Sequence, residues 1–146
     1  MDMLGAEERP SPTRRALLDP ALVPAINSIA NICYQASKEG GWHNDRVTGL
    51  PRTDAENDAL VPTRLMLTVG ELSEAMEAHR CDKMDDKLPH RSGLEVELAD
   101  AVIRIFDLAR AMNLDIGGAM VEKITYNLSR VDHTPAARNA KGGKKY

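Results

Sequence analysis

The chain has 146 residues, enough for one domain with its own hydrophobic core and too few for two ordinary domains. Its net charge of −3 argues against a general nucleic-acid binder or membrane-surface binder, because both rely on many lysine and arginine contacts. The two cysteines make neither a disulfide framework nor a zinc motif, and no apolar run reaches the roughly 18 residues that span a bilayer. We therefore expect a cytoplasmic protein without membrane contacts.

The first part of the chain predicts an arm, a helix and a long loop. Residues 1–18 mix proline, arginine, glutamate and serine without periodicity, which is typical of a flexible arm. A helix is expected from residue 19 or 23 to Lys38, with Gly40 and Gly41 ending it. Residues 40–59 are polar and rich in turn-forming residues, which predicts a loop. Loops of that length in compact domains are often functional.

The remainder predicts three more helices and a tail. The second helix is expected from Pro62 to Arg80, and the third from a capping pattern at residues 92–95 to residue 113. The fourth should follow Asp115 and run to about residue 131, and residues 133–146 form a basic tail. No segment predicts a strand. The expected fold is all-α, with residues 19–132 as one helical domain.

Two pairs of acidic residues lie on consecutive predicted helices. Glu71 and Glu74 lie three residues apart on the second helix, as do Glu97 and Asp100 on the third. Residues at that spacing share a helix face, so two packed helices could direct four carboxylates into one space. Hard oxygen ligands suit Mg²⁺ or Mn²⁺, which substrate phosphates often complete. The pattern predicts metal-assisted cleavage of a phosphate ester or phosphoanhydride.

The alternative is that these acids lie on a solvated face. With 22 acidic residues in the chain, an acidic pair at spacing three arises readily by chance. The acids nevertheless border the apolar residues expected to pack, and buried carboxylates are costly unless paired or metal-bound. The expected packing stripes are Leu65, Val69, Leu72 and Met76 on the second helix, and Leu94, Leu98, Ala101, Val102, Ile105, Ala109 and Met112 on the third.

Three further features bear on function. Gly70 costs about 1 kcal/mol in a helix relative to alanine, which indicates either simple helix packing or close approach of a backbone or ligand. Residues 65–69 are apolar almost all round, which predicts a symmetric oligomer. On the fourth helix, Lys123, Asn127 and Arg130 share a face that suits phosphate and sugar oxygens, although cations are also ordinary near a helix C-terminus.

Together these motifs resemble the MazG-like all-α nucleoside triphosphate pyrophosphatases. The resemblance covers residues 60–132 and rests on GELSEA at residues 70–75, ELADAV at 97–102 and the following Lys123 and Asn127. It implies a four-helix bundle assembled as a homodimer or homotetramer. It also implies Mg²⁺ held by the four acids, and hydrolysis of a (d)NTP to the monophosphate and pyrophosphate. We expect two or more Mg²⁺ ions between the acids and the triphosphate. Glu74 is the candidate general base.

The substrate is less closely specified. A likeness to the phage-encoded branch that cleaves dGTP favours dGTP or GTP in a bacterial or phage-infected cytoplasm, while dCTP, dUTP or a broad range remain alternatives within the family. In the loop, Trp42 and His43 could stack on or hydrogen-bond the base, although a tryptophan that fills space between helices is an equal interpretation.

Two other classes compete. A di-iron carboxylate bundle normally needs Glu-x-x-His pairs, and this chain has none. The other is a non-catalytic oligomeric adaptor whose basic tail touches nucleic acid.

Overall fold

The computed structural model describes residues 19, 21–130, 132 and 134–143. Within these residues the secondary structure is helical, without strands, and two isolated bridges join Asn44 to Pro51 and Met84 to Ser92. The helices are α2 (Leu22–Glu39), α3 (Asp54–Ala59), α4 (Val61–Arg80), α5 (Gly93–Ala111), α6 (Ile116–Ser129) and α7 (Pro135–Asn139). The all-α prediction is confirmed. The expected N-terminal arm at residues 1–18 lies outside the described residues.

The chain divides into two compact units. The first unit is Ile26–Ile116 and holds most of α2 together with α3, α4 and α5. The second consists of the described residues of Met1–Ala25 and Gly117–Tyr146, and it holds α6 and α7. The helical domain expected over residues 19–132 therefore contains residues of both units.

The end of α2 follows from its two glycines. Gly41 has a φ of +79°, in the left-handed region that glycine adopts without steric cost. The amide of Gly40 donates to the carbonyl of Ala36 at 3.0 Å, and the amide of Trp42 donates to Ser37 at 3.1 Å. These bonds satisfy the last carbonyls of the helix, as in a glycine C-cap.

The segment at residues 40–59 is only partly the expected loop, because its last third forms α3. Thr53 caps this helix: its hydroxyl accepts from the Glu56 amide, and the Glu56 carboxylate accepts from the Thr53 amide at 2.7 Å. This reciprocal capping box satisfies two otherwise unpaired amides and explains why so polar a sequence is helical.

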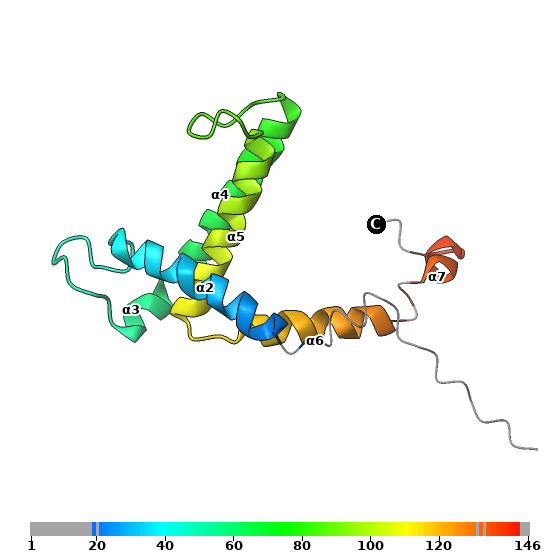
Figure 1. Ribbon diagram of the computed structural model, residues 1–146, viewed down its shortest axis with the longest axis horizontal. Coiled ribbons are helices and arrows are strands. Elements are labelled where there is room, and N and C mark those ends of the chain that lie inside the picture. The colour runs from blue at the N-terminus through cyan, green and yellow to red at the C-terminus, as the bar shows by residue number, and fades with distance from the viewer. Residues whose placement is uncertain (1–18, 20, 131, 133, 144–146) are drawn as a thin grey trace, which may run out of the picture. The chain divides into compact units, whose positions relative to one another are not determined.

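Helices α4 and α5 lie side by side as a hairpin (Figure 1). Ser92 begins α5 by accepting from the Glu95 amide at 3.2 Å. At Gly93 the helices approach so closely that an added Cβ would lie 2.8 Å from Ala78 Cβ and 3.2 Å from the Lys83 carbonyl oxygen. Only glycine fits there, and it brings the two helices together near the turn.

The face of α4 that is buried is not the predicted one. The expected stripe is largely exposed, with Leu65 at 52%, Val69 and Leu72 at 48% and Met76 at 64%. The residues buried instead are Thr68, Glu71, Ala75 and Ala78 on α4, and Gly93, Ala101, Leu108 and Ala109 on α5. Small side chains let two helices approach closely, so the bulky residues are left outside this seam. Of the expected α5 stripe, Leu98, Val102 and Ile105 are likewise exposed.

In the second unit, α6 ends at Ser129, two residues before the predicted end. In the expected tail, Thr134 caps the short helix α7 by accepting from the Ala137 amide. Residues 133 and 144–146 lie outside the described residues. Across the described chain, no helix is both long enough and apolar enough to cross a membrane.

Candidate metal centre

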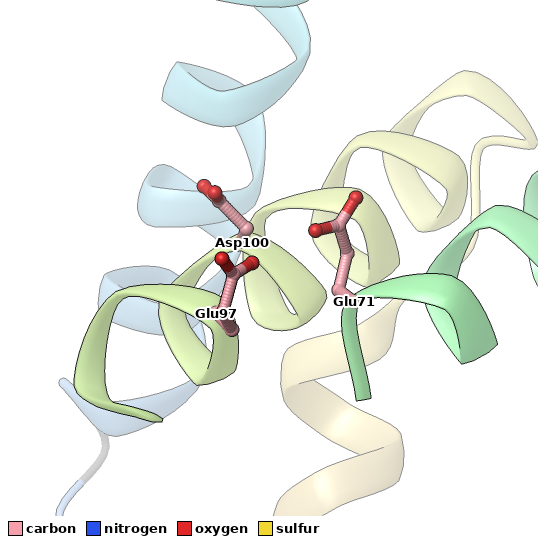
Figure 2. A group of neighbouring side chains, drawn as sticks. All are labelled: Glu71, Glu97 and Asp100. Carbon is pink, nitrogen blue, oxygen red and sulfur yellow. The ribbon is translucent and has the colours of Figure 1, made fainter. Parts of the chain in front are cut away.

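Three carboxyl groups meet on the α4–α5 hairpin. Glu71 comes from α4, and Glu97 and Asp100 come from consecutive turns of α5. Each offers one oxygen such that all three oxygens lie within 4.8 Å of one another. Figure 2 shows the three side chains near one another, with Glu71 on α4 and Glu97 and Asp100 on α5. Three of the four carboxyl groups that the sequence predicts to lie together are therefore close to one another.

Glu71 is the most enclosed of the three. It is 8% exposed, and Arg104 of α5 donates from Nε to its Oε1 at 2.5 Å. Arg104 lies one turn after Asp100 on the same helix, so its guanidinium reaches across the seam to α4. This ion pair supplies the positive charge that a buried carboxylate needs.

Crowding of the acids changes their proton affinity. Burial raises the pKa of Glu97, and the charge of Glu74, a hydrogen bond with Glu71 and the charge of Asp100 raise it further. Burial and the charge of Glu71 also raise the pKa of Asp100, while Arg104 opposes that rise. Both carboxyls thus hold protons more strongly than free ones do. A cation placed between them would have the opposite effect.

Glu74 lies beside this group rather than within it. It is exposed on α4 and lines, together with Glu97, an open pocket of about 260 Å³ near the turn of the hairpin. The same pocket is lined by Glu77, Lys83, Asp85 and Asp86. Glu74 is close enough to Glu97 for its charge to raise that residue's pKa. It therefore faces solvent next to the three clustered carboxyls.

The donor set suits a hard divalent cation. Carboxylate oxygens are the ligands that Mg²⁺ and Mn²⁺ prefer, whereas the histidine and cysteine ligands typical of zinc are absent from this cluster. Three protein oxygens would leave coordination positions for water or for phosphate. The cluster can thus hold such an ion while leaving room for a ligand.

The two aromatic residues predicted to contact a base have different environments. Trp42 is 76% exposed, and its backbone carbonyl accepts from Arg52 Nη1 at 2.9 Å. His43 is 5% exposed, with Nε2 at 2.7 Å from Asp107 and Nδ1 at 3.2 Å from Arg64 Nη2. Both ring nitrogens of His43 are therefore engaged inside the fold. Of the two, Trp42 is the ring that is open to a ligand.

The hydrogen-bond network around His43 has no signature in the sequence. Arginine has no acceptor, so Nδ1 must accept from Arg64 and the ring proton lies on Nε2, which donates to Asp107. Ser37 donates to the other oxygen of Asp107 at 3.1 Å, and the Tyr34 ring packs edge-on against the imidazole. The network joins α2, the following loop, α4 and α5. No local spacing connects residues so far apart in the chain.

The cationic face expected on the fourth helix lies in the second unit. Lys123 is exposed on α6, with Nζ 5.0 Å from the centre of the Tyr126 ring. Asn127 Oδ1 is shielded from solvent and has no hydrogen-bond partner among the described residues. Arg130 follows the end of α6 and donates to both carboxylate oxygens of Asp132, at 3.0 and 2.6 Å. The two adjacent guanidinium nitrogens that could bind a phosphate are therefore already bonded to Asp132.

Comparison with models of protein families, with curated proteins and with solved structures found no match to this chain. The assignment of function therefore depends on the acid cluster and on the motifs in the sequence.

Proposed function

We propose that this protein is a Mg²⁺-dependent nucleoside triphosphate pyrophosphohydrolase that converts a (d)NTP and water into the monophosphate and pyrophosphate. The observation that carries the proposal is the convergence of Glu71, Glu97 and Asp100, whose oxygens lie within 4.8 Å of one another. These residues belong to the two acidic motifs on which the resemblance to MazG-like enzymes rests.

Each clustered acid has a proposed role. Glu71, Glu97 and Asp100 hold the cation, for which Mn²⁺ can substitute, and more than one ion per site is expected with substrate. When bound, Mg²⁺ lowers the pKa of a water and offsets the negative charge of the pyrophosphate leaving group. Glu74 accepts the proton from the attacking water, because it is exposed and lies beside Glu97.

The remaining contacts to substrate come from two other segments. Lys123 and Asn127 are assigned to phosphate and sugar, and the unsatisfied Oδ1 of Asn127 supports an acceptor role for that amide. Arg130 is a weaker candidate, because Asp132 occupies its donors. Trp42 is assigned to stacking on the base, since its ring is exposed on a loop held by bonds such as Arg52 to the Trp42 carbonyl.

The preferred substrate is proposed to be dGTP or GTP. Guanine carries hydrogens on N1 and N2 that need acceptors, which backbone carbonyls of residues 40–59 can supply. A site built to accept those hydrogens rejects analogues that lack them by large factors. Preference for dCTP or dUTP, or a broad range, is the alternative within the same reaction.

A homodimer or homotetramer is part of the proposal. The outward face of α4 carries Leu65, Val69, Leu72 and Met76, each about half exposed or more. No side chain among the described residues is both large and fully buried. Soluble monomers rarely leave so many bulky apolar groups in water, so a second copy is expected to cover this face.

One assay tests the reaction directly. The protein is incubated with each (d)NTP and Mg²⁺ or Mn²⁺, and the products are separated. Monophosphate with pyrophosphate supports the proposal, and diphosphate with phosphate contradicts it. Hydrolysis of none of the nucleotides would favour the non-catalytic adaptor. Comparing dGTP with dITP, which lacks only the N2 amino group, then tests guanine recognition; equal kcat/KM for all four dNTPs would make the enzyme broad in specificity.

A further inference from the structure

Arg104 is the cation that touches the acid cluster. Among the residues that the structure describes, no other lysine, arginine or histidine forms an ion pair with Glu71, Glu97 or Asp100. It reaches from α5 to α4, and its Nε donates to Glu71 Oε1 at 2.5 Å. It therefore neutralises a carboxyl that the proposed metal site would use.

The two partners of this ion pair differ in exposure. The side chain of Glu71 is 11% exposed, whereas that of Arg104 is 43% exposed. A buried carboxylate left without a cation is strongly destabilising. Arginine, by contrast, can move its charged end into water while its aliphatic stem stays packed. Arg104 can thus leave the pair more easily than Glu71 can.

The ion pair between Arg104 and Glu71 also has the weaker of the two common arginine–carboxylate geometries. Glu71 is bonded by Nε, whereas strong arginine–carboxylate pairs use two parallel donors. The pair between Arg130 and Asp132 shows the stronger arrangement in this chain, with two donors on two oxygens. Arg104 therefore supplies positive charge to the cluster but does not form the bidentate hydrogen bonds that would fix its position.

We propose that Arg104 is the counter-ion of Glu71 in the absence of metal and that a divalent cation displaces it. This inference rests on the metal site of the proposed function. An ion bound by Glu71 would lie close to the Arg104 guanidinium, because Nε of Arg104 donates to the same carboxylate. Positive charges so close together repel one another. The cation takes over the neutralisation of Glu71, and the Arg104 guanidinium turns to solvent beside the site.

Mn²⁺ binding measured by titration calorimetry tests the exchange without any nucleotide. Arg104→Met removes the charge and keeps an apolar stem of similar length. If Mn²⁺ must displace Arg104, this variant should bind Mn²⁺ about tenfold more tightly than the parent protein. Arg91→Met is the matched control, because Arg91 is likewise paired with a glutamate, but that glutamate, Glu95, lies outside the cluster. It should leave the affinity unchanged.

A second measurement uses the unaltered protein and so does not depend on the folding of a variant. The Nε–H signal of Arg104 is followed by ¹⁵N–¹H NMR during Mg²⁺ titration and is identified by its loss in Arg104→Lys. On saturation with Mg²⁺ it should move to the position and fast solvent exchange of an unpaired arginine. A signal that stays unchanged while Mg²⁺ binds would overturn the proposal.

The outcomes separate this inference from the function on which it rests. Equal or weaker Mn²⁺ binding by Arg104→Met overturns the exchange and leaves the metal site standing. Failure of the parent protein to bind Mn²⁺ or Mg²⁺ overturns both. If Arg104→Met binds Mn²⁺ more tightly but the parent protein hydrolyses no (d)NTP, the exchange is supported and the proposed reaction is wrong.

Discussion

The two faces of α4 differ in the size and polarity of their side chains. One face is buried or half-buried and its side chains are small or polar. Its residues recur at spacings of four and three: Arg64, Thr68, Glu71, Ala75 and Ala78. The other begins one residue later and is bulky, apolar and largely exposed: Leu65, Val69, Leu72 and Met76. The two faces are about 100° apart on the helix.

The most hydrophobic face of a helix therefore need not be the one that packs within its own chain. Small residues allow α4 and α5 to approach closely, as the 2.8 Å between Ala78 Cβ and the position of a Cβ on Gly93 shows. The same close seam brings Glu71 next to Glu97 and Asp100. The bulky face then remains for a partner, proposed here to be a second copy. Four predictions test this division.

The largest effect is expected at the acidic face. Asp100→Asn should lower (d)NTP hydrolysis more than about tenfold and weaken Mn²⁺ binding, because it removes a charged ligand. Without metal the variant should be as stable as the parent protein or more so, since repulsion among the carboxyls falls. Glu74→Gln should lose activity as well. The measurements are steady-state rates, calorimetric titration and urea unfolding.

Glu95→Gln is the control, because Glu95 lies on α5 but is exposed and paired with Arg91. A rate for Asp100→Asn above about a tenth of the parent rate would rule out its role as a metal ligand.

The next effect concerns the bulky face. Leu72→Asp places a charge where a second copy is expected to pack, so it should convert the oligomer to a monomer at micromolar concentration. Light scattering coupled to size exclusion gives the mass. Leu88→Asp, in the connector between α4 and α5, should leave the assembly intact. If the parent protein is itself a monomer under these conditions, the assignment of this face is wrong.

Two glycines give a matched pair of smaller effects. Gly93→Ala should destabilise the fold by roughly 1–3 kcal/mol, because the new methyl group overlaps Ala78 and the Lys83 carbonyl. At Gly70 the added Cβ meets no atom within 4 Å, so Gly70→Ala should stabilise the subunit by about 1 kcal/mol through helix propensity. Urea unfolding measures both.

Among the described residues the close approach of α4 and α5 is therefore at Gly93, whereas a Cβ at Gly70 would meet no atom within 4 Å. Loss of the oligomer in Gly70→Ala, with the subunit still folded, would show that a second copy packs against this position.

The smallest effect is the pH dependence of the metal-free protein. The pKa values of Glu97 and Asp100 are raised in the fold. At a pH between the ordinary and the raised pKa of these groups, the native state therefore binds more protons than the unfolded chain. The free energy of unfolding should therefore fall as pH rises through that window, which begins at about 4. Urea unfolding with chelator from pH 4 to 7 measures it.

Glu97→Gln should flatten this dependence, since it removes one of the two titrating groups. A stability that rises over the same pH range in the parent protein but not in Glu97→Gln would contradict the crowding of these carboxyls.

Local patterns anticipated much of the fold because their causes are local. Gly40 and Gly41 ended α2, Pro62 began α4 within a residue of its observed start, and Ser92 capped α5. The helix at residues 54–59 was missed although Thr53 and Glu56 have capping-box spacing, since the surrounding polarity outweighed that signal. The spacing of the acids anticipated the cluster of Glu71, Glu97 and Asp100, because residues three apart on a helix share a face.

Local sequence is enough to predict the all-helical class, most helix limits and the acidic pair on each helix, because all of these depend on residues within one or two turns of each other. Three features depend on tertiary packing: which face of α4 is buried, the pairing of Arg104 with Glu71, and the enclosure of His43 between Asp107 and Arg64. These contacts join residues 21 to 64 positions apart. They depend on how closely two helices can approach, which is set by the small residues that meet across the seam and not by the hydrophobicity of either helix alone.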